Sequence, residues 1–398
     1  MPAPSKSPEF PNSQSAVITA VRVVRLSRIL TREEQWYSSD WRAIKADRAL
    51  VEITTSGGVT ALGELSSAAP LFGVERCVDW IAQRILGSPL NDAFQFARPT
   101  GSSRMWDAAA AGVDSALWDA RAQVDEHPLN ECWNQASLNR VETVADAGCC
   151  LDWAVTTETV LEEAAACAAY PFGSYAIRLG TAWEWDHVRP DRFLALVWEL
   201  RSELGGTALI VDADERLSVQ DAHELANELS EIGCVTMRRP FPISDLDAYR
   251  ELAASAVLPV TAGGTLTTYE RLLPFLEEGL LGGIEFEIGL CGISEAARRC
   301  RLAADYALPV HAVGDLGAVG AFSSAAVLAG NCEDGRLYLP YSHGVLAGGI
   351  LDQTITLRES VFEFTRSPGT GIELTAELEA TFPWIEGAAS VSVNRELP

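Results

Sequence analysis

The stretch Ala208-Leu209-Ile210-Val211-Asp212-Ala213-Asp214-Glu215-Arg216 decides the fold. Four apolar residues end in acids, and an amphipathic segment, 220–232, follows them. Similar short apolar runs return further along the chain at 234–237, 258–261, 283–290 and 308–313. Short buried-type strands alternating with helix-length segments indicate repeated βα units and a parallel sheet. Because so many units follow one another without a nucleotide-binding fingerprint, the pattern favours a closed barrel, whose chemistry gathers where the strands end.

Length and composition narrow the class of protein. At 398 residues the chain exceeds a minimal barrel, which predicts one barrel plus a smaller domain. The net charge of −25 argues against nucleic acid or an anionic membrane surface as partner. No apolar run is long enough to span a membrane. The nine cysteines form no C-x-x-C pair, which fits reduced, mostly buried thiols and predicts a cytoplasmic protein.

Local signals divide the chain into four parts. The first residues are polar and rich in Pro and Ser, and two strand-like runs flank the hairpin signal Ser56-Gly57-Gly58. Two helical patterns follow, and the βα alternation begins near Val141. After about Ala347 the pattern returns to strands. The predicted parts are a flexible tail (1–15), an α+β capping domain (16–135), the barrel (136–347) and a segment that completes the capping domain (348–398).

Four stretches, taken in order, resemble the signature elements of the enolase superfamily in its mandelate racemase/muconate lactonizing enzyme branch. They are Leu62-Gly63-Glu64, the helical run 110–120, Cys291-Gly292-Ile293-Ser294-Glu295-Ala296, and Ser367-Pro368-Gly369-Thr370-Gly371-Ile372-Glu373-Leu374. The resemblance covers about Val17 to Leu374. It implies an α/β fold, a (β/α)7–8 or modified TIM barrel, with an α+β capping domain formed by the N- and C-terminal segments. It leaves the reaction open, because this scaffold hosts racemases, cycloisomerases and dehydratases.

The resemblance implies proton abstraction beside a carboxylate, with the resulting enediolate stabilised by Mg²⁺. Three carboxylates at the ends of strands three, four and five would hold that ion. Only the first of these positions is retained, as Asp212, while the second falls on Arg238 and the third on Gly264. A guanidinium beside a lone aspartate repels a divalent cation. We therefore expect no metal, and no other cofactor, at this site.

The acid–base positions differ from the family as well. Its Lys-x-Lys pair on strand two falls on Ala176-Ile177-Arg178. Arg178 stays protonated, so it is a poor base but a good clamp for a carboxylate. Asp214 shares its strand parity with Asp212 and can assist there. Trp36 and Tyr37 lie in a polar stretch where the family places a specificity lid.

On strands six and seven, the residues that correspond to the family's functional positions are less certain from the alignment. On strand six the family's polar residue aligns best with Phe286, which Glu285 and Glu287 flank. On strand seven the family's histidine falls on Val313 or on His311, depending on the alignment. These two residues have the same parity along a strand, so we expect His311 to face the barrel mouth in either case.

The favoured hypothesis is a metal-independent lyase or isomerase that acts on a small carboxylate or acid-sugar-like molecule. The predicted catalytic residues are His311, Asp212 and Asp214. The predicted substrate-binding residues are Arg178, Arg238, Glu287, Trp36 and Tyr37. The family's tendency to assemble implies a homo-oligomer.

Two alternatives remain. In one, a salt bridge between Asp212 and Arg238 neutralises an inactive barrel, and the chain is a silent relative that binds a ligand or serves in an assembly. In the other, the chain is an ordinary Mg²⁺-dependent enzyme that recruits Asp214 and Glu287 as ligands.

Overall fold

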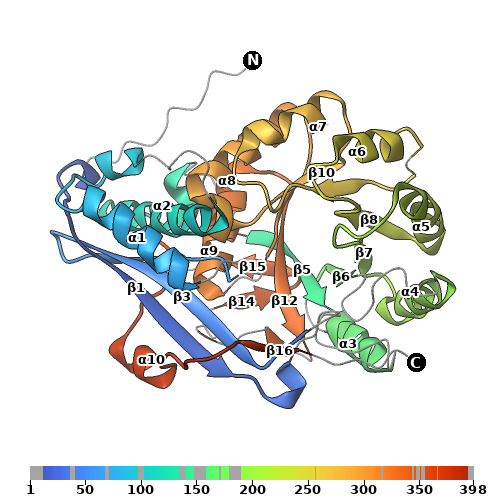
Figure 1. Cartoon of the computed structure of the whole chain (residues 1–398), viewed down its shortest axis with the longest axis horizontal. Helices are drawn as coiled ribbons and strands as arrows, with labels where there is room; N and C mark the ends of the chain where they lie inside the picture. The colour runs from blue at the N-terminus through green and yellow to red at the C-terminus, as the bar shows by residue number, and fades with distance from the viewer. Residues whose placement is uncertain are drawn as a thin grey trace.

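The computed structural model describes residues 12–35, 41–67, 71–96, 103–133, 140–147, 158–169, 172–178, 190–255, 257–314, 317–342, 345–346, 350, 355–364 and 366–392. These residues form a closed parallel barrel of eight strands beside a smaller α+β domain (Figure 1). The predicted fold class is confirmed. Most of the expected N-terminal tail, together with Trp36 and Tyr37, lies outside the described residues.

The barrel closes because its last strand pairs in parallel with its first. Its strands are β5 (Arg140–Ala147), β6 (Ser174–Arg178), β7 (Ala208–Asp212), β8 (Cys234–Arg238), β9 (Val260–Ala262), β10 (Gly283–Phe286), β11 (Val310–Ala312) and β12 (Gly335–Ser342). The apolar run at 283–290 is longer than the strand it predicted. The strand ends at Phe286, and Ile288 already begins the next helix.

Helices cover the outside of the barrel (Figure 1). They are α3 (Glu158–Ala169), α4 (Pro190–Leu204), α5 (Val219–Ile232), α6 (Leu246–Ala253), α7 (Leu273–Glu277), α8 (Ile288–Asp305) and α9 (Ala318–Asn331). The ends of α5 show why its sequence forms a helix there. The Ser218 hydroxyl accepts the backbone N–H of Asp221 at its start, and Gly233, at φ 88°, ends it in the left-handed region.

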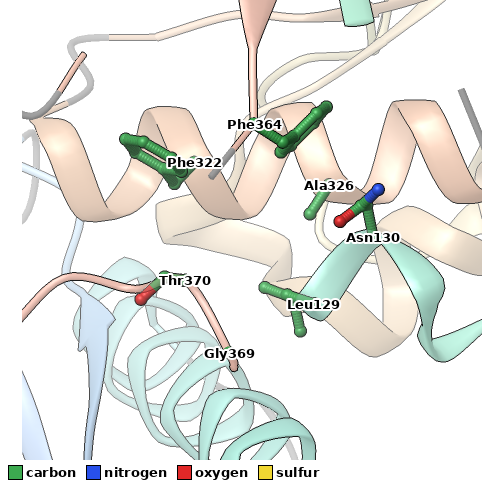
Figure 2. A pocket seen from close by; sticks show the side chains of 7 residues that line it. All are labelled: Leu129, Asn130, Phe322, Ala326, Phe364, Gly369 and Thr370. Atoms are coloured by element: carbon green, nitrogen blue, oxygen red, sulfur yellow. The ribbon is translucent and has the colours of Figure 1, made fainter. Parts of the chain in front are cut away.

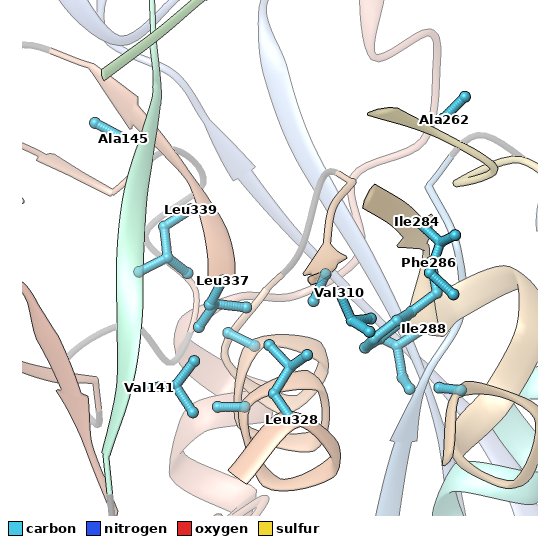
Figure 3. Close-up of a cluster of buried hydrophobic side chains, with 14 of the residues drawn as sticks. Val141, Ala145, Ala262, Ile284, Phe286, Ile288, Val310, Leu328, Leu337 and Leu339 are labelled. Atoms are coloured by element: carbon cyan, nitrogen blue, oxygen red, sulfur yellow. The ribbon is translucent and has the colours of Figure 1, made fainter. Parts of the chain in front are cut away.

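The main core lies between the strands and this helical layer. Alternate strand residues point outward, and Figure 3 shows Ile284, Phe286 and Val310 gathered near Ile288 at the start of α8. The strand-six alignment that placed Phe286 at the barrel mouth is therefore wrong. Phe286 is fully buried in this outer core, and its neighbour Glu285 faces the barrel axis instead.

A second, smaller apolar cluster fills the barrel interior. Its members are Val144, Ala176, Ile210, Val313 and Tyr338. Residues of the same strand parity that lie beyond this cluster, towards the C-terminal strand ends, are charged. We call those strand ends the mouth of the barrel, and the charged residues there form the candidate site described below.

The capping domain is an antiparallel sheet covered by two helices. Its strands are β1 (Ile18–Ile29), β3 (Lys45–Thr55) and β4 (Thr60–Glu64), and its helices are α1 (Leu71–Ile85) and α2 (Arg104–Val124). The predicted hairpin at 56–58 is confirmed, because β3 and β4 pair on either side of it. The two predicted helices are confirmed as well.

The family-like stretches form the surface where the two domains meet. Helix α2 packs against α8, which breaks its helical geometry at Gly292 with φ 79°. A Cβ atom there would lie 2.8 Å from Oδ2 of Asp114, the carboxylate that accepts the backbone N–H and the hydroxyl of Ser294. Gly63 allows a similarly close approach of β4 to α2, because its Cβ would lie 2.0 Å from the carbonyl oxygen of Gly112.

Two buried carboxylates tie distant segments together. Glu64, at the end of β4, accepts the backbone N–H groups of Gly317 and Gly320 at 2.7 and 2.8 Å, at the start of α9. A carboxylate of the capping domain thus accepts the free N–H groups at the start of the barrel helix α9. Asp119 of α2 accepts the N–H of Leu62 at 2.8 Å and that of Thr370 at 2.7 Å.

The C-terminal segment divides between the two domains. Strand β16 (Ser390–Ser392) pairs with β2 (Trp41–Ala43) beside the capping domain. Strand β15 (Val361–Glu363), however, pairs antiparallel with β5 and extends the barrel sheet. Within the described ranges no helix is long and apolar enough to cross a membrane, and the seven described cysteines are free thiols.

Candidate functional site

Three arginines surround Asp212 at the mouth of the barrel. Arg239 donates to both of its carboxylate oxygens, from Nε to Oδ1 at 3.1 Å and from Nη2 to Oδ2 at 2.5 Å. Arg238 Nη1 lies 3.3 Å and Arg178 Nε 3.6 Å from Oδ2 of the same carboxylate. The expected Asp212–Arg238 ion pair is thus present, but Arg239 is the tighter partner. We call Asp212 and these three arginines the guanidinium cluster.

Arg239 is a site residue that the sequence did not reveal. Strand alternation predicts that it points away from the axis, because Arg238 before it points inward. Its φ of 44° places it in the left-handed region instead, and its side chain reaches back over Asp212. Asp214 and Glu215 also have positive φ, at 53° and 63°. Three strained non-glycine residues at one place are typical of a functional site.

The strain is held by backbone hydrogen bonds between neighbouring strand ends. The N–H of Arg239 donates to the carbonyl of Thr261 at 2.8 Å, and the N–H of Glu215 donates to the carbonyl of Arg239 at 2.8 Å. The side chains of this region are therefore positioned by the barrel framework. Preorganised groups of this kind need little rearrangement when a charged ligand binds.

Arg238 is buried beneath this layer. Its Nε donates to Oε1 of Glu285 at 2.8 Å, and its guanidinium carbon lies 4.3 Å from the centre of the Tyr338 ring. Thr261 donates to the same Glu285 oxygen at 2.9 Å. Only 2% of Arg238 is exposed. The structure therefore corrects the expected direct contact between Arg238 and a substrate, because its contacts hold it inside the protein.

The arginines of the guanidinium cluster keep the buried carboxylates beside them ionised. Burial alone would raise the pKa of Asp212, but Arg239, Arg238 and Arg178 together hold it well below its usual range. The pKa of Glu285 is likewise lowered by Arg238 in spite of burial. A carboxylate held as an anion by three guanidinium groups is a weak proton acceptor. Asp212 is therefore suited to holding the arginines in place, and the geometry does not favour it as a base.

Arg178 and Asp146 lie at the open side of the cluster. Arg178 is the last residue of β6, and its side chain is 34% exposed. Its Nη2 lies 3.8 Å from Oδ2 of Asp146, near the end of β5. Burial raises the pKa of Asp146, although Arg178 acts in the opposite direction. Sequence reasoning missed Asp146; the signal was an acid at the end of the first barrel strand.

Asp214 and Glu287 occupy different surroundings. The Asp214 side chain is 27% exposed and accepts Arg239 Nη2 at 3.0 Å, but it lies beyond the end of β7 at positive φ, so strand parity does not account for its position. Glu287 precedes α8, and the hydroxyl of Ser66 donates to it at 2.5 Å. This contact places Glu287 where the capping domain meets the barrel.

His311 lies deeper than expected. Its parity is as predicted, but only 1% of the residue is exposed and its ring lies 5.5 Å from that of Tyr338. Burial lowers its pKa to about 3, so the imidazole is neutral. The expectation that His311 faces the mouth is wrong, because β11 places it in the barrel interior, level with Glu285. A direct proton transfer to a ligand at the mouth is not supported by this position.

The side chains at the family's metal position do not fit Mg²⁺. The oxygens of Asp212 already accept guanidinium groups, and Arg238 stands at the second ligand position. At the third, a Cβ atom on Gly264 would lie 2.9 Å from Cγ2 of Val313 and 3.3 Å from Oε2 of Glu285. Among the residues that the structure describes, no group of three or more His, Cys, Asp or Glu side chains is arranged to hold a metal.

One small hollow lies away from the guanidinium cluster. Its open volume is about 200 Å³, and Figure 2 shows it between the 3-10 helix Leu129–Cys132, α9 and the C-terminal segment. The residues that line it are Leu129, Asn130, Phe322, Ala326, Phe364, Gly369 and Thr370. Since it contains no charged side chain, it is not a site for the predicted carboxylate.

Comparison with known proteins places this geometry in a family. The chain is 23% identical over 276 residues to an o-succinylbenzoate synthase from Geobacillus stearothermophilus, covering 67% of this chain and 70% of the relative. It is 24% identical over 384 residues to a D-galactonate dehydratase family member from Pseudarthrobacter chlorophenolicus, covering 84% and 91%. Their names, a synthase and a dehydratase family member, point to different reactions.

Solved structures share the fold. A member of the enolase superfamily from Polaromonas sp. JS666 superposes with a TM-score of 0.82 at 22% identity, covering 93% of this chain and 98% of that one. A 3,6-anhydro-D-galactonate cycloisomerase from Zobellia galactanivorans gives 0.76 at 17% identity, covering 92% and 100%.

Two family models match the sequence itself. The mandelate racemase/muconate lactonizing enzyme N-terminal domain matches residues 39–132, and the enolase C-terminal domain-like model matches residues 159–378. With more than half of its length matched by the second model alone, the chain belongs to the mandelate racemase/muconate lactonizing enzyme family of the enolase superfamily.

Proposed function

We propose that this protein is a lyase or isomerase that abstracts a proton beside the carboxylate of a small carboxylate or acid-sugar-like substrate, without Mg²⁺. The observation that carries the proposal is the guanidinium cluster, in which arginines surround Asp212 at the place where the family holds its metal. The most exposed of these guanidinium groups, Arg178, provides fixed positive charge towards an anionic substrate, as a cation would.

Arg178 is the residue that we assign to substrate binding. Of the three arginines it has the most exposed side chain, at 34% compared with 16% for Arg239 and 2% for Arg238. A guanidinium binds a carboxylate through two parallel hydrogen bonds. When the substrate carboxylate is bound to Arg178 in this way, the carbon next to it would lie at the barrel mouth.

The proton transfer then needs a base near that carbon. Asp214 is the best placed of the predicted catalytic residues, because its side chain is 27% exposed while Asp212 and His311 are buried. The base takes the proton, and the electron pair of the broken C–H bond forms the C=C bond of an enediolate. The enediolate carries one negative charge more than the carboxylate, and the two charges on its oxygens are stabilised by Arg178 and, through space, by Arg239. Return of the proton to the other face gives an isomerase, and loss of a neighbouring leaving group gives a lyase.

His311 has a supporting role in this proposal. A neutral, buried imidazole beside Tyr338 helps to fix the interior on which Glu285 and Arg238 rest. Replacing His311 with glutamine is therefore expected to lower stability more than turnover. A loss of turnover in a stably folded His311→Gln variant would instead show that His311 takes part in the proton transfer.

The reaction can be tested without knowing the product. In D₂O, abstraction of the proton next to a carboxylate exchanges it for deuterium, so its proton NMR signal disappears. We expect exchange with at least one member of a panel of D-galactonate, D-gluconate and mandelate. Arg178→Leu should abolish it, while the exposed Arg250→Leu control should leave it unchanged. Exchange that requires added Mg²⁺ and stops with a chelator would refute the metal-independent part of the proposal.

A silent relative is the second candidate. The observation that favours it is the mutual neutralisation of Arg238, Glu285 and Asp212, each at most 2% exposed. Such a network stabilises a barrel that does no chemistry. This reading predicts that carboxylates raise the melting temperature through Arg178 while no member of a wide panel exchanges its proton.

A further inference from the structure

Asp146 is an unusual carboxylate in this chain. It lies near the end of β5 with the same parity as Val144, which belongs to the interior cluster, so it faces the barrel axis at the mouth. Only 8% of the residue is exposed. Its described contact is the ion pair with Arg178 at 3.8 Å, which is too long for a hydrogen bond.

Other buried carboxylates of the same protein are satisfied differently. Asp119 accepts two backbone N–H groups, and Glu64 does the same. Asp212 and Glu285 accept hydrogen bonds from arginine and from a further donor each. Within the described part of the chain, Asp146 accepts none. Its side chain is 11% exposed and its oxygens are not among the described buried atoms that lack a partner, so they can accept a hydrogen bond from a group that enters at the mouth.

We propose that Asp146 accepts a hydrogen bond from a hydroxyl group of the ligand whose carboxylate binds Arg178. The ligand class is then a small hydroxycarboxylate, in which one molecule supplies both the anion and the donor. This inference rests on the proposed function, since it uses Arg178 as the carboxylate site. It makes Asp146 a residue that determines specificity.

A role as counter-ion for Arg178 does not by itself explain why Asp146 lies at this position. Arg178 also lies 3.6 Å from Asp212, which is fully buried and ionised. A carboxylate that served only as a counter-ion would form a direct, charge-assisted hydrogen bond with the guanidinium, as Asp212 does with Arg239. The wider spacing at Asp146 leaves its oxygens directed to a partner that enters from the mouth.

The test compares two ligands that differ in their hydroxyl groups. D-gluconate and hexanoate share a six-carbon chain and one carboxylate. Isothermal titration of the full chain with each ligand gives their affinity ratio. We expect the unaltered protein to prefer D-gluconate by roughly 10- to 100-fold, the range for a hydrogen bond to a charged group. Asp146→Leu should reduce that preference to about 3-fold or less, and hexanoate should bind at least as tightly as before.

Asp146→Asn keeps an acceptor oxygen while removing the charge, so it should retain a smaller preference of roughly 5-fold, typical of a hydrogen bond between neutral groups. It also remains informative if the leucine variant fails to fold. Asp247→Leu, on the surface of α6, is the control and should change neither affinity. An unchanged preference in a folded Asp146→Leu variant, or equal binding of both ligands by the unaltered protein, overturns the inference. Hexanoate binding that is lost in Arg178→Leu would still support the carboxylate site in those cases, whereas no binding of either ligand would overturn both proposals.

Discussion

Replacing Arg238 with methionine is expected to lower the free energy of unfolding by about 3–5 kcal/mol, the range for removing one partner of a buried ion pair. Methionine keeps most of the apolar volume of the side chain, so the change isolates the charge. Arg238 is 2% exposed, and both carboxylates that it contacts are fully buried. Its removal leaves Glu285 with the hydroxyl of Thr261 as its described hydrogen-bond donor.

Urea unfolding followed by circular dichroism measures this loss. The matched control is Arg250→Met on α6, whose guanidinium forms a two-point pair with Glu278 while 45% of its side chain is exposed. Exposed ion pairs contribute little to stability, so the control should lose much less than Arg238→Met. A double variant, Arg238→Met with Glu285→Gln, should be more stable than Arg238→Met alone, because no uncompensated carboxylate remains at position 285. A loss at Arg238 no larger than at Arg250, or a double variant less stable than the single one, would refute the reasoning.

Three further predictions concern buried groups. The pKa of His311 is about 3 in the folded protein, below its value in the unfolded chain. The contribution of neutral His311 to stability is therefore present above about pH 6.5 and is lost as the pH falls towards 3. His311→Gln should flatten the curve of stability against pH in this range. Burial raises the pKa of Asp119 to about 6. The contribution of this carboxyl group to stability is therefore present below about pH 4 and is lost as the pH rises through 6. In urea titrations the difference in stability between the unaltered protein and Asp119→Asn should shrink from pH 4 to pH 7. Gly264→Glu restores a family ligand, yet it should lower the melting temperature and create no response to Mg²⁺, because its Cβ would press on Val313; stabilisation by the ion would contradict this.

The sequence predicted the barrel and several residues at its mouth, because a strand that ends in an acid is a clear pattern. Asp212, Arg178 and Arg238 lie at strand ends where the alternation placed them. The same rule misplaced Arg239, since its positive φ reverses the side-chain direction that an extended strand would give.

Strands six and seven show a second limit. Strand β10 has only four buried residues, and its short alternation, which favours Glu285, conflicted with the family alignment, which favoured Phe286. The choice between Glu285 and Phe286 therefore required the structure. For His311 the face was predicted but not the depth, because depth depends on how far neighbouring strands are shifted along the barrel axis.

The carboxylate of Asp119 has a consequence for synthesis on the ribosome. It accepts N–H groups from Leu62 and from Thr370, and the second of these lies 251 positions further along the chain. The capping domain is thus completed only when a segment translated 251 positions after Asp119 has been made. Until then Asp119 is a nascent helix residue that lacks one of its donors, so a ribosome stalled before position 370 should carry a capping domain that proteases cut readily.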